Sequence, residues 1–122
     1  MSTPIGPYSP VVRAGPWLIT SGQLGLAPPA DGEPPKLVAG GAPEQLGQAL
    51  VNAGRLLADH GAGIGDVVKT TVFVTDMTGY AAVNEAYVAY FGDHRPARSV
   101  VGVAGLPMGA AVEVEVWAFR SP

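Results

Sequence analysis

Hydrophobic residues along this chain follow two spacings, one typical of strands and the other typical of helices. β-branched and aromatic residues cluster over Trp17–Ser21, Val67–Val74 and Arg98–Val103, and these stretches predict three strands. Between the first two, leucines and alanines recur at helical spacing. This pattern predicts a helix that begins at Pro43 and ends at Gly61.

A second helix is predicted between the second and third strands, with Asp76 or Thr78 as its N-cap. Its apolar stripe at helical spacing consists of Tyr80, Val83, Tyr87, Tyr90 and Phe91.

Successive side chains of a strand point to opposite faces of the sheet, so the sequence predicts which residues share a face in two of the strands. One face of the second strand is expected to carry Val68, Thr70, Val72 and Val74. A fourth strand is predicted over Val112–Phe119, and its apolar face carries Val112, Val114, Val116 and Ala118. Its other face carries Glu113, Glu115, Trp117 and Phe119. A face that mixes carboxylates with aromatic rings indicates an interface or the wall of a cleft.

The order strand, helix, strand, helix, strand, strand predicts an α+β fold in which two helices cover one face of a sheet. We expect residues 1–122 to form one domain, with the proline-rich segment Ala27–Pro35 as a surface loop. The uncovered face of the sheet needs a partner. Because only 14% of the residues are charged, we expect other subunits to provide it.

The composition narrows the classes of function. The net charge of −3, without blocks of like charge, argues against nucleic acid as the main partner. There is no cysteine, and His60 and His94 lack a metal-ligand pattern, so we expect no metal site. The N-terminus does not resemble a signal peptide, and the longest uncharged stretch, Ser99–Val112, is too short to span a membrane. We therefore expect a soluble cytoplasmic protein.

Arg98 is the strongest candidate for a binding residue. Pro96 prevents a helix from continuing, so Arg98 is expected to begin a strand with its guanidinium facing apolar surroundings. A guanidinium in such a place needs an anionic partner. That partner is either Glu113 or Glu115, in a structural ion pair, or the carboxylate of a small ligand held by two hydrogen bonds.

Glu113 is the second candidate. A carboxylate on a largely covered strand face can have a raised pKa and act as a general acid or base. The alternative is a salt bridge or a solvent-facing position, and for Glu115 this alternative is stronger still.

Three weaker candidates lie near the N-terminus. Tyr8, in a proline-rich segment, could close a pocket with its hydroxyl, or it could only pack the N-terminal arm. Ser21 and Gly22 follow a strand and could meet a ligand through a hydroxyl and an accessible main chain, or form an ordinary strand end. Within the second helix, Asn84–Glu85 is expected to lie at the surface.

A set of short segments is more specific together than any one of them alone. In chain order they are Ile5–Ser9, Ser21–Gln23, Val67–Met77, Val83–Glu85, Tyr90–Gly92, Pro96–Ser99, Leu106–Pro107 and Val112–Glu115. By these segments the chain resembles the RidA/YjgF family of enamine/imine deaminases from Ile5 to about Ala118.

The resemblance implies a chorismate-mutase-like α+β fold with a mixed sheet, and a homotrimer with ligand clefts between subunits. It implies hydrolysis of enamines and imines such as 2-aminoacrylate to 2-oxo acids and ammonia, without a cofactor. By the same resemblance Arg98 would bind the substrate carboxylate and Glu113 would position the attacking water. Tyr8, Ser21, Gly22 and the main chain at Val100 would line the pocket.

Two positions depart from the family pattern. Val100 stands where a cysteine is common, and Pro10 stands where a glutamine is common. The first hypothesis is a deaminase of small carboxylate-bearing imines, which can serve a specialised pathway. The two departures motivate a second, a carboxylate-binding or chaperone-like protein without turnover. A third is a ribonuclease, an activity assigned to some members of the family, which the acidic charge balance disfavours.

Overall fold

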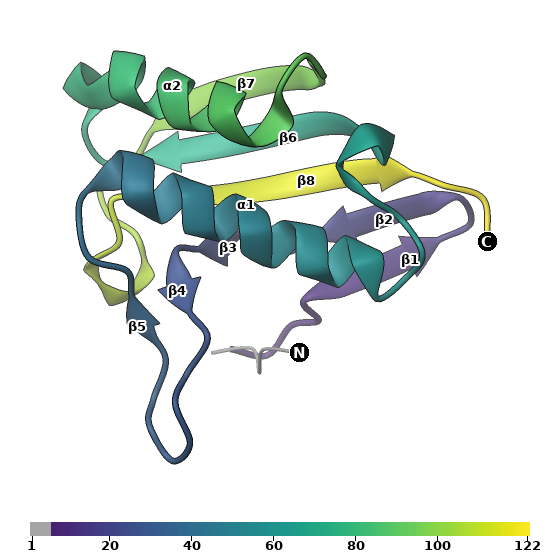
Figure 1. Cartoon of the computed structure of the whole chain (residues 1–122), viewed down its shortest axis with the longest axis horizontal. Helices are drawn as coiled ribbons and strands as arrows, with labels where there is room; N and C mark the ends of the chain where they lie inside the picture. Colours follow the sequence, from purple (N-terminus) through teal and green to yellow (C-terminus); the bar gives the residue numbers. More distant parts are fainter. Residues whose placement is uncertain (1–5) are drawn as a thin grey trace.

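The molecule has two layers, a mixed sheet and a pair of helices packed on one of its faces (Figure 1). The structure is a computed structural model, and it describes residues 6–122. The strands are β1 (Val11–Ala14), β2 (Trp17–Thr20), β3 (Gln23–Leu24), β4 (Leu26–Ala27), β5 (Lys36–Leu37), β6 (Val67–Val74), β7 (Ala97–Gly102) and β8 (Val112–Phe119). The helices are α1 (Ala42–Ala58) and α2 (Tyr80–Phe91), with 3₁₀ turns at Ile64–Asp66, Met77–Gly79 and Pro107–Gly109.

The main sheet runs in the order β1-β2-β8-β6-β7, and β3 also pairs with β8. All neighbours are antiparallel except β6 and β7, which are parallel and joined through α2. Strands β4 and β5 form a separate hairpin that carries the proline-rich loop away from the body of the molecule (Figure 1). Strand β7 is therefore an edge strand, with one neighbour in the sheet.

Helix α1 begins and ends where local chemistry favours it. Pro43 occupies its first turn, and the main-chain N–H of Gly41 donates to the Glu44 carboxylate at 2.8 Å. After the last turn Gly61 adopts a φ of +78°, which a glycine tolerates without strain. The predicted helix is confirmed, but it ends at Ala58 with Asp59 as its C-cap, before the predicted Gly61. Its Leu46 side chain is fully buried against the sheet.

The core lies between the helices and β8. The predicted apolar face of this strand is confirmed, because Val112, Val114, Val116 and Ala118 are each at most 1% exposed. Burying a valine side chain contributes about 2 kcal/mol. The strand is thus fixed in register, and the residues between these four, including Glu113, must face the opposite side.

One predicted face is wrong in part. Thr70, Val72 and Val74 are buried as expected, but Val68 is 42% exposed. The pairing of β6 with β8 passes from Val67 directly to Lys69, so Val68 is the extra residue of a β-bulge. Val67 takes the buried place instead.

The second helix also begins later than expected. Asp76 accepts hydrogen bonds from the N–H of Thr78 at 3.0 Å and from its hydroxyl at 2.6 Å, but it caps the short 3₁₀ turn that precedes α2. Helix α2 then starts at Tyr80, and Val83, Tyr87 and Phe91 form its buried stripe.

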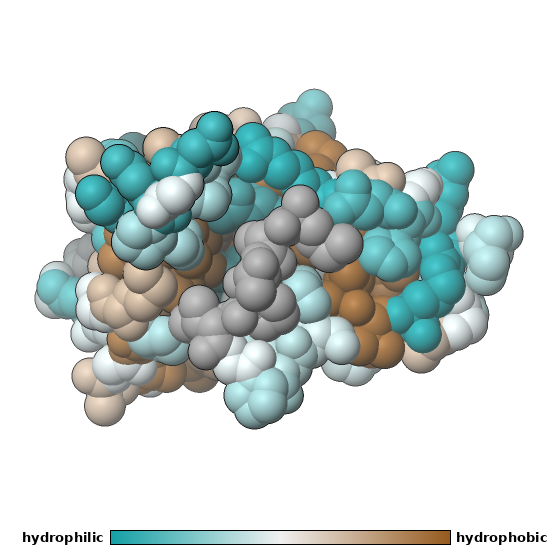
Figure 2. Space-filling view, turned by 90° about the horizontal axis from the view of Figure 1, so that it is seen from below, coloured by the Kyte–Doolittle hydropathy of each residue, from teal (hydrophilic) through white to brown (hydrophobic). Residues whose placement is uncertain are grey.

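The sheet face opposite the helices remains open and partly apolar. Trp17 packs edge-to-face with Trp117, with ring centroids 5.8 Å apart, and with Phe119 at 5.0 Å. Exposed apolar side chains on this face are Val12, Val101, Trp117 and Phe119. The view from below, which looks onto the side of the β4–β5 hairpin and not onto the open face, also shows hydrophobic surface between hydrophilic stretches (Figure 2). The fold thus leaves apolar area uncovered in a single chain. Neither helix within residues 6–122 has the length and apolar character needed to cross a membrane.

Candidate functional site

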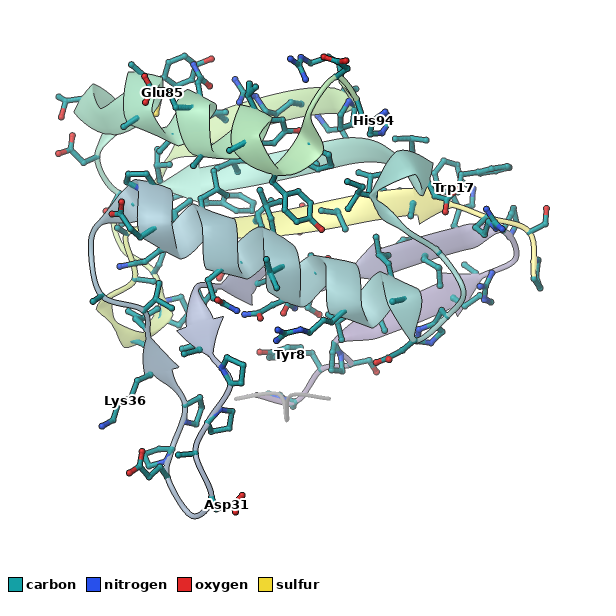
Figure 3. The ribbon with its side chains drawn as sticks, viewed as in Figure 1. Tyr8, Trp17, Asp31, Lys36, Glu85 and His94 are labelled. Carbon is teal, nitrogen blue, oxygen red and sulfur yellow. The ribbon has the colours of Figure 1, made fainter. Side chains whose placement is uncertain are left out.

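The N-terminal arm is tied to the end of β2. The Ser21 hydroxyl donates to the main-chain oxygen of Ser9 at 2.6 Å, and the Ser21 N–H donates to that of Pro10 at 2.8 Å. Tyr8, which follows Gly6 in this arm, is 44% exposed. It lies on the side of α1 away from α2 (Figure 3). Ile5, the first residue of the motif, lies outside the described residues.

Gly22 lies directly against the Glu113 carboxylate. A Cβ at this position would overlap Oε2 and Cδ of Glu113. The close approach arises because the chain leaves β2 at Ser21 and rejoins β8 at β3, where Leu24 pairs with Glu113. The structure therefore brings Ser21, Gly22 and Glu113 to one place on the open side of the sheet. We call these three residues the glutamate side of the site.

Burial raises the pKa of the Glu113 carboxyl, and the like charge of Glu115 on the same strand face raises it further. Within residues 6–122, no hydrogen bond or ion pair to this carboxylate is formed. Glu113 can therefore hold a proton at higher pH than an ordinary glutamate does, which is the property that a general acid or base requires.

Arg98 is held by two tyrosines of α2. Its Nη2 donates to the Tyr80 hydroxyl at 3.0 Å, and its guanidinium carbon lies 4.8 Å from the centre of the Tyr87 ring. The Tyr87 hydroxyl is in turn 2.7 Å from Oγ1 of the buried Thr70. The guanidinium is thus oriented by a hydrogen bond and a ring face, which leave most of its five donors for another partner.

The expected alternative, an ion pair of Arg98 with Glu113 or Glu115, is not formed among the described residues. Arg98 pairs with the buried Thr70, so it lies on the helix-covered face of the sheet. Glu113 pairs with Phe73 and lies on the open face. Within one chain, the two predicted catalytic residues therefore point to opposite sides of the sheet.

Beside Arg98 lies an open hollow of about 390 Å³ between α2 and the start of β7. It is lined by Asn84, Tyr87, Val88, Arg95, Pro96 and Arg98. We call it the arginine hollow. Val100 follows on the same face of β7, half-buried against the core.

The sequence did not predict two residues of this hollow. Asn84 was expected at the surface, but its side-chain Oδ1 is buried and has no hydrogen-bond partner among the described residues. Arg95 was not predicted as a site residue, although its position three residues before Arg98 and next to Pro96 is a signal for it. Residues 6–122 contain no group of three His, Asp or Glu side chains placed to hold a metal ion.

Comparisons with known proteins cover nearly the whole chain. The sequence matches the family described as Endoribonuclease L-PSP over residues 1–120. It is 43% identical to a protein of Mus musculus named 2-iminobutanoate/2-iminopropanoate deaminase, over 97% of this chain and 84% of the relative. The protein of the same name from Homo sapiens is 41% identical, over 97% and 83%.

Solved structures agree with these matches. The YjgF gene product of E. coli superimposes with a TM-score of 0.86 at 40% identity, covering 96% of this chain and 91% of that one. E. coli TdcF with bound serine superimposes with a TM-score of 0.87 at 36% identity, covering 97% and 91%.

Proposed function

This chain belongs to the Endoribonuclease L-PSP family, that of the RidA/YjgF proteins, and from this premise we propose that it hydrolyses reactive enamines and imines of small 2-amino acids. Relatives at 41–43% identity over 97% of the chain carry the name 2-iminobutanoate/2-iminopropanoate deaminase. The observation that carries the proposal is Arg98, a guanidinium oriented by Tyr80 and Tyr87 with no carboxylate partner among residues 6–122.

The reaction needs little from the protein. A 2-imino acid, R–C(=NH₂⁺)–COO⁻, adds water at its electrophilic carbon and collapses to R–CO–COO⁻ and NH₄⁺. An enamine such as 2-aminoacrylate first tautomerises to 2-iminopropanoate. Binding the carboxylate, placing a water and moving protons suffice, so no metal or cofactor is proposed.

Arg98 would bind the substrate carboxylate with donors that Tyr80 leaves free. Glu113, with its raised pKa, would take a proton from the attacking water and return it to the departing nitrogen. The glycine at position 22 would leave room for substrate beside the carboxylate. Tyr8 and Ser21 would complete the pocket on the glutamate side, and the Val100 main chain would do so on the arginine side.

One substrate can meet both Arg98 and Glu113 only where two chains meet, because these residues lie on opposite faces of the sheet within one chain. We therefore propose a homotrimer of the chorismate-mutase-like type, acting in the cytoplasm. Each of its clefts would join the arginine hollow of one chain to the glutamate side of the next. The apolar residues on the open face and the edge position of β7 support such an assembly.

The test uses 2-aminoacrylate generated from serine by a dehydratase, with release of ammonia and pyruvate followed over time. We expect the protein to accelerate release. Arg98→Ala should lower kcat/KM on the order of 10²-fold, because it removes the cation that pairs with a desolvated carboxylate. Arg55→Ala, an exposed arginine of α1, is the matched control and should keep full activity. Full activity in Arg98→Ala would overturn the proposal.

A second candidate is a carboxylate-binding protein without turnover, which the serine bound to E. coli TdcF favours. Titration calorimetry with 2-oxobutanoate separates the two: tight binding without ammonia release from any imine would favour it. RNA cleavage, the activity in the family's description, is checked with the same purified variants. With seven basic residues in 122, we expect no cleavage that depends on Arg98.

A further inference from the structure

The arginine hollow contains a second cation that the proposed reaction does not use. Arg95 and Arg98 both line it, in a protein whose net charge is −3. Burial raises the pKa of the Tyr87 hydroxyl, while its hydrogen bond to Thr70 and the charges of Arg98 and Arg95 lower it. Two positive charges therefore converge on one side of α2.

Part of the Arg95 guanidinium makes no hydrogen bond among the described residues. Its Nη1 donates to the main-chain oxygens of Gly92 and His94, which fixes the side chain against the loop that follows α2. Its Nη2 and Nε make no hydrogen bond within residues 6–122. The neighbouring Asp93 forms no ion pair with it, since the ion pair in the described part of the chain joins Arg120 and Asp66 at 3.5 Å.

The hollow is open, with a volume of about 390 Å³ in a single chain, so both arginines border one solvent-accessible space. Asn84 also lines the hollow, but its Oδ1 is buried beneath the surface and is not available to an occupant.

We propose that Arg95 is a specificity residue that binds a second carboxylate, so that the preferred substrates are 2-imino dicarboxylates, the imines of acidic amino acids. Arg98 binds the carboxylate next to the imine carbon, and Arg95 binds the one at the far end of the chain. The inference rests on the proposed function for the role of Arg98 and for the imine. The chemistry at the imine carbon is unchanged: water adds, ammonium leaves, and the distal carboxylate takes no part.

The test compares two stable product analogues that differ only in the terminal carboxylate, 2-oxoglutarate and 2-oxopentanoate. By titration calorimetry we expect 2-oxoglutarate to bind at least about tenfold more tightly, the effect of one hydrogen-bonded charge pair. In Arg95→Met this ratio should fall to near one, while 2-oxopentanoate binds as before. Arg95→Lys should keep part of the preference, because it keeps the charge and loses the planar fork. Arg55→Met removes the same charge elsewhere and should keep the full ratio.

A second readout follows ammonia release from the imines of glutamate and of 2-aminopentanoate, each made by an amino-acid oxidase with catalase present. Hydrolysis of both imines at equal kcat/KM, or an unchanged ratio in Arg95→Met, would overturn the inference and leave the proposed function standing. Tight and Arg95-dependent binding of 2-oxoglutarate with no hydrolysis of either imine would overturn the proposed function and, with it, the substrate preference. Arg95 would then remain only a residue that binds a carboxylate.

Discussion

The Tyr80 hydroxyl decides how the Arg98 guanidinium is presented. It accepts a hydrogen bond from Nη2 at 3.0 Å, while the Tyr87 ring lies 4.8 Å from the guanidinium carbon. Neither contact neutralises the charge. A guanidinium held in this way is oriented for a carboxylate without being paired to one, which lowers the entropy lost when substrate binds.

For this reason Tyr80→Phe should weaken substrate binding more than it slows turnover. We expect KM to rise about threefold to tenfold with kcat nearly unchanged, because one hydrogen bond to a charged group is lost. Tyr90→Phe, in the same helix, removes a hydroxyl without a hydrogen bond in residues 6–122 and serves as the control. A loss confined to kcat would show that Tyr80 does not act through carboxylate binding.

The negative charge of Glu113 should lower the free energy of unfolding. Its folded-state pKa is raised above the unfolded value, so the folded protein holds this proton more tightly than the unfolded chain does. The cost is absent below the unfolded pKa of about 4.3 and is fully present once the pH exceeds the raised folded pKa.

Glu113→Gln should therefore raise Tm at pH 7 and have no such effect at about pH 3.5, where the wild-type carboxyl is already protonated. Differential scanning calorimetry at both pH values measures this, with Glu33→Gln in the exposed hairpin loop as the control. A lower Tm for Glu113→Gln at pH 7 would indicate that the carboxylate has a stabilising partner in the assembled protein.

At the scale of elements, the break between β2 and β3 shapes the glutamate side. Ser21 and Gly22 occupy the break, and the Thr20 hydroxyl accepts a hydrogen bond from the N–H of Val116 at 3.1 Å, a bond that bridges to β8. The chain thus passes beside the Glu113 carboxylate without a side chain in the way.

Gly22→Ala should accordingly impair catalysis. The new methyl group overlaps the Glu113 carboxylate and must displace it, so we expect kcat to fall by about tenfold or more. Gly47→Ala adds the same methyl group on α1, where no atom lies within 4 Å of it. It should leave kcat unchanged and stabilise the helix by about 0.5–1 kcal/mol. Unchanged turnover in Gly22→Ala would remove Glu113 from the mechanism.

Elements with strong local patterns could be predicted from the sequence, and those set by distant partners could not. Strand β8 matches its prediction from Val112 to Phe119, because strict alternation specifies both its bounds and its faces. The bulge at Val68 depends on the register of β6 against β8, a pairing between distant parts of the chain. The same holds for the site. Arg98 could be predicted as a binding residue because a guanidinium in apolar surroundings needs an anionic partner. The burial of the Asn84 Oδ1 could not be predicted, because it arises from the packing of α2 and not from neighbouring residues in the sequence.

At the scale of the whole molecule, the two groups of proposed site residues lie on opposite faces of one sheet. The arginine hollow lies between α2 and β7, and the glutamate side lies at the end of β2. A closed ring of identical chains can bring the hollow of each chain against the glutamate side of the next. The open face, with Trp117 and Phe119 exposed, gives such a ring apolar surface to bury.

The most direct measurement of this claim mixes two variants that the proposed mechanism expects to be nearly inactive, Arg98→Ala and Glu113→Gln, refolded together in equal amounts. If each site takes its arginine from one chain and its glutamate from the next, random assembly restores both residues in about a quarter of the sites. We predict that the mixture recovers about a quarter of the wild-type rate of ammonia release from 2-aminoacrylate. A mixture no more active than its parent variants would mean that both residues serve from the same chain, and the account of a site shared between chains would be wrong.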